Sequence, residues 1–214
     1  MEEVKVKVRV PTNWNDITLE TYLKYKKTLD LYKDDDEDEL DMIDKSIIIS
    51  LDILCGVAPN FASQMPIEML QHVMDSLNKF MTDTKFDLQR IITIDGIEYG
   101  FEPNLSNMSY GAYLDISKYD NITIDTNWTK IMAILYRPIL SKSGKLYEIK
   151  EYTGMEDDTI FLKTTMDINF GCIGFFLHLS KDLALYTLKS LKEGQEMNLL
   201  LQSIMERSGK DTPQ

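Results

Sequence analysis

The fold class follows first from one stretch of the chain, Ile91-Ile92-Thr93-Ile94-Asp95-Gly96-Ile97-Glu98-Tyr99-Gly100-Phe101. Two runs rich in β-branched and aromatic residues flank Asp95-Gly96. This two-residue turn tolerates positive φ angles, and its twist matches that of the strands on either side. The stretch therefore predicts a β-hairpin. Because a lone hairpin is only marginally stable in water, a third strand is expected.

The N-terminus offers a candidate for that strand, since valines alternate there with cations: Val4, Lys5, Val6, Lys7, Val8, Arg9 and Val10. A strict period of two predicts a half-buried strand. We predict that it pairs with one strand of the hairpin and completes a small antiparallel sheet. Residues 137–149, which surround Ser141-Lys142-Ser143-Gly144, predict a second hairpin or a long loop.

Most of the remaining chain predicts helix, giving an α+β fold that is predominantly α-helical, with about seven helices. Gly56 is the expected C-terminal cap of the second helix and Asp167 the expected N-terminal cap of a very apolar one. A polar tail follows at residues 208–214. The expected helices cover residues 18–31, 40–54, 66–81, 109–118, 128–136, 168–179 and 182–191, and an amphipathic stretch covers 195–206.

Two packing predictions come from these helices. The core face of the third helix should consist of Met69, Leu70, Val73, Leu77 and Phe80. In the apolar helix, the small residues Gly171 and Gly174 should let a neighbouring helix approach closely.

A loose internal repeat relates two helix starts, Asp16-Ile17-Thr18-Leu19-Glu20-Thr21-Tyr22-Leu23 and Asn107-Met108-Ser109-Tyr110-Gly111-Ala112-Tyr113-Leu114. Both copies are expected to open with a helix cap, a small polar residue at Thr18 and Ser109. It reflects either two diverged half-domains or chance. A duplication predicts that the two helices superpose, with Tyr22 over Tyr113 and both tyrosines facing the core. The expected division is an N-terminal half at 1–89, a second half at 90–207 and a flexible tail at 208–214.

Composition indicates a globular chain of 214 residues with 43% apolar content. Cys55 and Cys172 each lie in an apolar run, where a free thiol behaves as a small hydrophobe, so both are expected to be buried and reduced. Together with an acidic N-terminus, this favours a cytoplasm-like compartment. The longest apolar run, 168–179, is shorter than the roughly 18 residues of a membrane span.

The net charge of −12 argues against direct nucleic-acid binding. The window from Asp30 to Asp44 contains nine acidic residues and one basic residue, Lys33, so it supplies −8 of this net charge. This window does not match the pattern of a calcium-binding loop, because Glu39 stands at the position of the required glycine and Lys45 at the position of the required glutamate. The run is expected to be a solvated connector between helices. The alternatives are adventitious binding of a divalent cation, or a docking site for a basic partner formed by Asp34, Asp35, Asp36, Glu37, Asp38 and Glu39.

No motif in the sequence indicates a particular reaction. His72 and His178 are the only imidazoles, and no zinc spacing, phosphate loop, dinucleotide fingerprint or nucleophile elbow occurs in the sequence. We therefore expect a protein that is not an enzyme, with no catalytic residue, cofactor or metal. Arg137, at a helix end before Pro138, either pairs with a carboxylate or carbonyls, or makes an interface contact.

Three further motifs are Tyr99-Gly100-Phe101-Glu102-Pro103-Asn104-Leu105, Tyr110-Gly111-Ala112-Tyr113-Leu114-Asp115 and Ala133-Ile134-Leu135-Tyr136-Arg137-Pro138-Ile139. Together they resemble a family of uncharacterised structural-module proteins in tailed phages of Bacteroidota, including crAss-like phages. The resemblance extends over most of the chain, and the acidic run belongs to none of its motifs.

The resemblance implies a non-enzymatic virion component that acts by protein-protein contacts near the portal and tail, as a ring, connector or packaged and ejected protein. The alternative is a soluble acidic tail-assembly chaperone that is not retained in the virion. The expected partners are other phage structural proteins, in a homo-oligomer or a hetero-assembly. The expected location is the virion, and the host cytoplasm during assembly.

Overall fold

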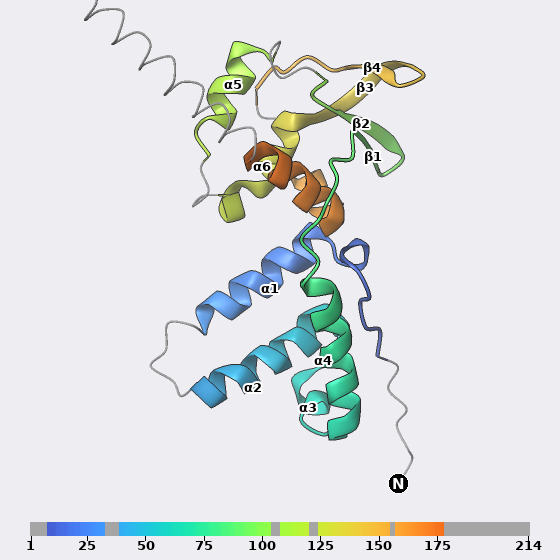
Figure 1. Cartoon of the computed structure of the whole chain (residues 1–214). Helices are drawn as coiled ribbons and strands as arrows, with labels where there is room; N and C mark the ends of the chain where they lie inside the picture. The colour runs from blue at the N-terminus through green and yellow to red at the C-terminus, as the bar shows by residue number, and fades with distance from the viewer. Residues whose placement is uncertain (1–7, 33–38, 104–107, 120–123, 155–156, 178–214) are drawn as a thin grey trace, which may run out of the picture. The chain divides into compact units, whose positions relative to one another are not determined.

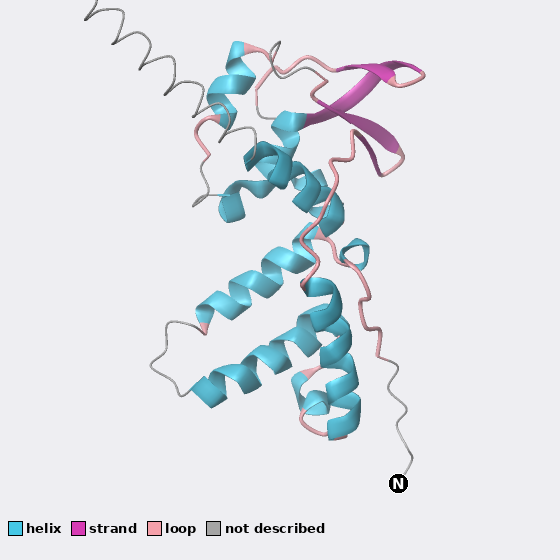
Figure 2. Cartoon of the chain, in the orientation of Figure 1, coloured by secondary structure: helices cyan, strands magenta, loops and turns pink. Residues whose placement is uncertain are grey.

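A computed structural model of the chain describes residues 8–32, 39–103, 108–119, 124–154 and 157–177. The residues as far as Cys172 group into one compact unit, whose helices and strands are shown in Figures 1 and 2. The predicted α+β class is confirmed, because the described residues form helices and a small four-stranded antiparallel sheet.

The N-terminal part is helical. Its elements are the 3₁₀ turn η1 (Trp14–Asp16), α1 (Leu19–Leu31), α2 (Glu39–Ile49), the π-helical turn η2 (Ser50–Leu54) that continues α2, α3 (Pro59–Ala62) and α4 (Ile67–Met81). The three predicted helices are confirmed to within one residue at their start, whereas the single turn α3 was not predicted.

Local chemistry sets the ends of these helices. Thr18 caps α1, its side chain accepting a hydrogen bond from the backbone N–H of Thr21. Gly56 ends the α2–η2 helix with a φ of +68°, as predicted, and its N–H donates to the carbonyl of Asp52 at 3.1 Å.

The predicted core face of α4 is correct for three of its five residues. Val73, Leu77 and Phe80 are buried. Met69 is exposed and Leu70 is half-buried, because both lie in the first turn of the helix, which extends past the core.

The sheet has the order β1-β2-β3-β4, with β1 (Ile91–Ile94), β2 (Ile97–Phe101), β3 (Tyr136–Ser143) and β4 (Leu146–Ile149). Asp95 and Gly96 have φ angles of 49° and 80°, so the predicted tight turn is confirmed. Of the two alternatives for 137–149, the hairpin is correct, and Gly144 at φ 60° opens its two-residue turn.

The third strand is β3, which pairs with β2 through Tyr99 opposite Pro138 and Phe101 opposite Tyr136. The prediction that the N-terminal run supplies it is wrong for residues 8–10, which form no strand, while residues 4–7 lie outside the described residues. The edge of β2 that a third strand would use is occupied by β3, and residues 8–10 are followed by Pro11, which has no backbone N–H to donate to a strand. Strand β3 follows directly from α6 (Ile124–Leu135).

Of the features predicted from the internal repeat, the helix cap is present in both copies, whereas the prediction that both tyrosines face the core is wrong. Ser109 caps α5 (Tyr110–Ile116) by accepting from the N–H of Ala112, as Thr18 does in α1. Tyr113, however, is exposed, because the buried face of this short helix consists of Ala112 and Ile116. Duplication itself and the division near residue 89 stay predictions.

The last helix among the described residues begins at residue 166, is described as far as residue 177, and follows the 3₁₀ helix η4 (Thr159–Lys163). Asp167 therefore lies in its first turn and is not its cap. Its carboxylate accepts instead from Gln89 Nε2 at 2.6 Å and Thr165 Oγ1 at 2.5 Å. The predictions for 182–191, 195–206 and 208–214, and for His178, lie outside the described residues.

Gly171 allows a close approach, although of a loop and not of the predicted helix. A Cβ added at Gly171 would lie 2.5 Å from the carbonyl oxygen of Asp87, while one at Gly174 would meet nothing within 4 Å. A side chain at Gly171 therefore forces the backbone of residues 87–88 to move.

This contrast gives a paired test. We expect Gly171→Ala to lower the free energy of unfolding by about 1–3 kcal/mol through overpacking. Gly174→Ala should be neutral or stabilising by up to about 1 kcal/mol, because alanine is the better helix former. Urea denaturation followed by circular dichroism measures both, and equal effects of the two substitutions would contradict the packing described here.

Candidate functional site

Arg137 is the centre of the candidate site. Its Nη2 donates to the carboxylate of Glu102, and its Nη1 donates to the backbone carbonyl of Lys150 at 3.0 Å. The two ionic side chains are only 12% and 9% exposed. Arg137 thus pairs with a carboxylate and a carbonyl, as one of its two predicted roles required. A contact with a partner stays a prediction.

The strands bring this pair together. Gly100 in β2 lies opposite Arg137 in β3, and the N–H of Glu102 donates to the carbonyl of Leu135 at 2.7 Å, just past the end of the paired strands. Side chains of directly opposed residues share one face of a sheet. Glu102 and Arg137 therefore emerge on the same face, two residues apart in the ladder.

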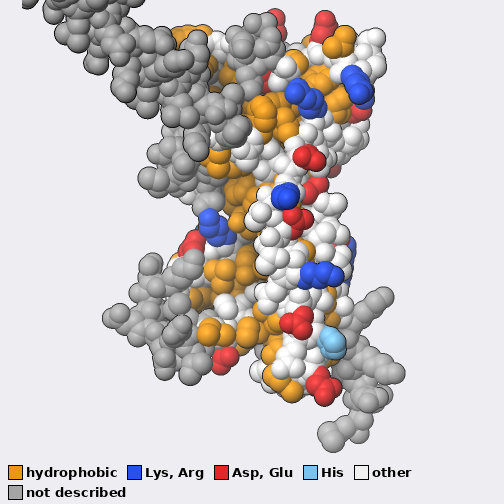
Figure 3. Space-filling model, viewed as in Figure 1, with side chains coloured by type: hydrophobic (Ala, Val, Ile, Leu, Met, Phe, Trp, Pro, Cys, Tyr) orange, Lys and Arg blue, Asp and Glu red, His pale blue; other side chains and the backbone are white. Residues whose placement is uncertain are grey.

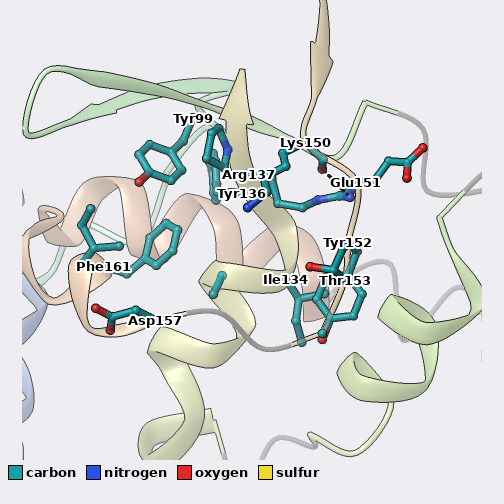
Figure 4. Close-up of a pocket in the computed structure, with 14 residues that line it drawn as sticks. Tyr99, Ile134, Tyr136, Arg137, Lys150, Glu151, Tyr152, Thr153, Asp157 and Phe161 are labelled. Carbon is teal, nitrogen blue, oxygen red and sulfur yellow. Dashed lines mark hydrogen bonds between the residues drawn. The ribbon is translucent and has the colours of Figure 1, made fainter. Parts of the chain in front are cut away.

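A small cavity adjoins Arg137 (Figure 4). Its volume is about 60 Å³, enough for a few water molecules and well below the roughly 300–1,000 Å³ of pockets that hold small molecules. It is lined by Tyr99, Ala133, Ile134, Tyr136, Arg137, Pro138, Lys150, Glu151, Tyr152, Thr153, Gly154, Asp157, Ile160 and Phe161.

Three tyrosine hydroxyls hold the segments around the cavity. Tyr136 donates to the carbonyl of Gln89 at 2.5 Å, Tyr147 to that of Phe101 at 2.7 Å, and Tyr152 to the carboxylate of Asp115 at 2.6 Å. Burial raises the pKa of all three phenols, so they remain neutral hydrogen-bond donors.

Asp115 connects α5 to this site. It accepts from Lys118 at 2.5 Å as well as from Tyr152. The hydrogen bond from Lys118, followed by that from Tyr152, lowers the pKa of the Asp115 carboxyl. The carboxylate is therefore ionised at neutral pH and fixes α5 to the chain after β4.

Tyr147 fastens β4 to the sheet. A Cβ added at Gly100 would lie 2.5 Å from the Tyr147 ring and 2.8 Å from Cγ2 of Ile149, so both side chains reach across β3 onto β2. Figure 3 shows hydrophobic side chains at the surface over the strands, next to lysine or arginine side chains. Tyr147 and Ile149 are both half-buried, so the face of the sheet that they form with Gly100 is only partly covered.

The other predicted site residues are not brought to Arg137 in the part of the chain that the structure describes. Asp34, Asp35, Asp36, Glu37 and Asp38 lie outside it, and Glu39 is the first residue of α2. Docking at the acidic run stays a prediction.

The remaining chemically interesting side chains are dispersed. His72 is exposed on α4. Cys55 and Cys172 are free and buried, as predicted, and burial raises the pKa of the Cys55 thiol to about 11. Among the described residues, no group of three or more His, Cys, Asp or Glu side chains is placed to hold a metal ion. No helix in the described ranges is long and apolar enough to cross a membrane.

Comparisons with protein-family models, curated proteins and solved structures find no match to this chain.

The Arg137–Glu102 pair gives a stability prediction. Arg137→Met should lower the free energy of unfolding by about 3 kcal/mol, because it removes the Arg137 cation from beside a carboxylate that is only 9% exposed. Adding Glu102→Leu should recover most of that loss, since a hydrophobic pair avoids the desolvation of two charges. Chemical denaturation of the single and double variants measures this, and a double variant less stable than Arg137→Met would contradict it.

Proposed function

We propose that this protein is a non-enzymatic component of a tailed-phage virion that acts by protein-protein contacts near the portal and tail, as a ring, connector or packaged protein. Its partners are other phage structural proteins, and it occurs in the virion and, during assembly, in the host cytoplasm. The observation that carries the proposal is an exposed apolar face on α5.

That face consists of Tyr110, Tyr113 and Leu114, which are 74%, 46% and 42% exposed. Positions i, i+3 and i+4 lie together on one side of a helix. The opposite side, with Ala112 and Ile116, is buried. Tyrosine is enriched where proteins bind each other, because its ring buries much apolar area while its hydroxyl still bonds.

The structure also relates the three motifs that resemble phage proteins to one another. Glu102 from the first motif pairs with Arg137 from the third, and Asp115 from the second is bonded by Tyr152, which lines the cavity beside Arg137. Motifs that form one connected structure are expected to occur together, which supports a resemblance based on a shared structural unit.

An acidic assembly chaperone is the second candidate, favoured by the net charge of −12. It would use the same α5 face transiently and then leave. Mass spectrometry of purified virions of the phage that encodes this chain distinguishes the two, because a structural component is found in the particle and a chaperone is missing from it.

Variants of α5 test the contact itself. We expect Tyr110→Ser with Leu114→Ser to keep the melting temperature but to abolish incorporation into particles when the variant replaces the wild-type protein. The matched control is Leu140→Ser, another exposed apolar residue, on β3, which should be incorporated normally. If the α5 variant entered particles as well as the control, the proposed contact face would be wrong.

A further inference from the structure

We propose that the tip of the β3–β4 hairpin in one copy docks on α3 and the first turn of α4 in a second copy. The hairpin tip consists of residues 142–146, and the α3–α4 surface consists of Phe61, Met65, Ile67, Glu68, Met69 and Leu70. This inference goes beyond the proposed function, because it concerns two other surfaces and stands whether or not the α5 face binds a phage protein.

The α3–α4 surface is apolar and only partly covered. Phe61, Ile67 and Met69 are 44%, 65% and 42% exposed, and Met65 and Leu70 are half-buried. Single exposed apolar residues are common on proteins, whereas several large ones in one short stretch are typical of an interaction site. Methionine side chains are flexible, so a surface that contains them can adapt its shape to a partner.

This surface belongs to a part of the chain that has only negative charges. Residues 46–78 contain three acids and no lysine or arginine, a net charge of −3. The three acids, Asp52, Glu68 and Asp75, are all exposed, and Glu68 lies between the exposed Ile67 and Met69. A surface that complements this one is therefore apolar and cationic.

The tip of the β3–β4 hairpin has that chemistry. Leu146 is 79% exposed, and Lys142 and Lys145 are exposed as well. Lys142 pairs with Glu98 at 2.8 Å, but both side chains of this pair are exposed, and such pairs contribute little stability. Residues 139–150 contain three lysines and one glutamate, a net charge of +2. The hairpin is thus a cationic element in a chain with a net charge of −12.

A second copy is the occupant that these two surfaces favour. The opposite charges of the hairpin and the α3–α4 surface attract each other, while their exposed apolar residues leave water on contact. Both surfaces are exposed in the same molecule, so the tip does not cover the α3–α4 surface of its own chain. Because the contact joins two different surfaces, each added copy presents both again, and repeated contacts give a closed ring or an open filament.

Charge exchange on the full chain tests the contact. Sedimentation velocity should show concentration-dependent association of the wild type, and Lys145→Glu and Glu68→Lys should each weaken it about tenfold. An equal mixture of the two variants should restore association, because each altered residue then meets an opposite charge. The matched control is Lys24→Glu, an exposed lysine on α1, which changes the net charge as Lys145→Glu does and should associate as the wild type does.

A second pair of variants tests the apolar part of the contact. Leu146→Ser should weaken association severalfold, whereas Leu140→Ser, at a 68% exposed leucine of the same hairpin outside the tip, should leave it unchanged. A wild type that is monomeric at every concentration would overturn the proposal. So would a mixture of Lys145→Glu and Glu68→Lys that stays monomeric, or a Leu146→Ser variant that associates normally. None of these results bears on incorporation through the α5 face, so the two tests fail independently.

Discussion

Aromatic packing around Phe170 is the interaction on which the rest of the described structure depends. Its ring centroid lies 4.8 Å from that of Trp14, 5.0 Å from Phe86, 5.6 Å from Tyr22 and 5.9 Å from Trp128. These rings come from η1, the segment before β1, α1, α6 and the last helix. Most of the contacts are edge-to-face, a favoured geometry worth more than area burial alone. One ring therefore joins helical elements to the segment that leads into the sheet.

The candidate site depends on this packing through α6. Trp128, buried against Phe170, fixes that helix, which runs without a loop into β3 and so places Arg137 opposite Gly100. A backbone hydrogen bond separately joins α1 to the residue after η4, since the N–H of Leu19 donates to the carbonyl of Thr164 at 2.8 Å. The exposed face of α5 depends on this site in turn. Asp115 of α5 accepts a hydrogen bond from Tyr152, which lines the cavity beside Arg137.

Sequence patterns predicted what local chemistry determines. The Asp95-Gly96 turn and the Thr18 and Ser109 caps depend on residues a few positions apart, and all three are confirmed. Pairing of β2 with β3 and of Glu102 with Arg137, 35 residues away, was missed because side-chain periodicity gives the face of a strand and not its partner. One indication in the sequence that Glu102 has a partner is its position directly after the apolar end of β2.

Equilibrium unfolding of Phe170→Ala tests the central role of this ring most directly. In the wild type, tryptophan fluorescence and circular dichroism should report one coincident urea transition, because the packing couples the elements into one cooperative unit. The variant should lose about 2 kcal/mol by both probes, because truncation of this half-buried ring removes its contacts with four aromatic neighbours. Separate transitions in the wild type, or an unchanged midpoint in the variant, would contradict the account.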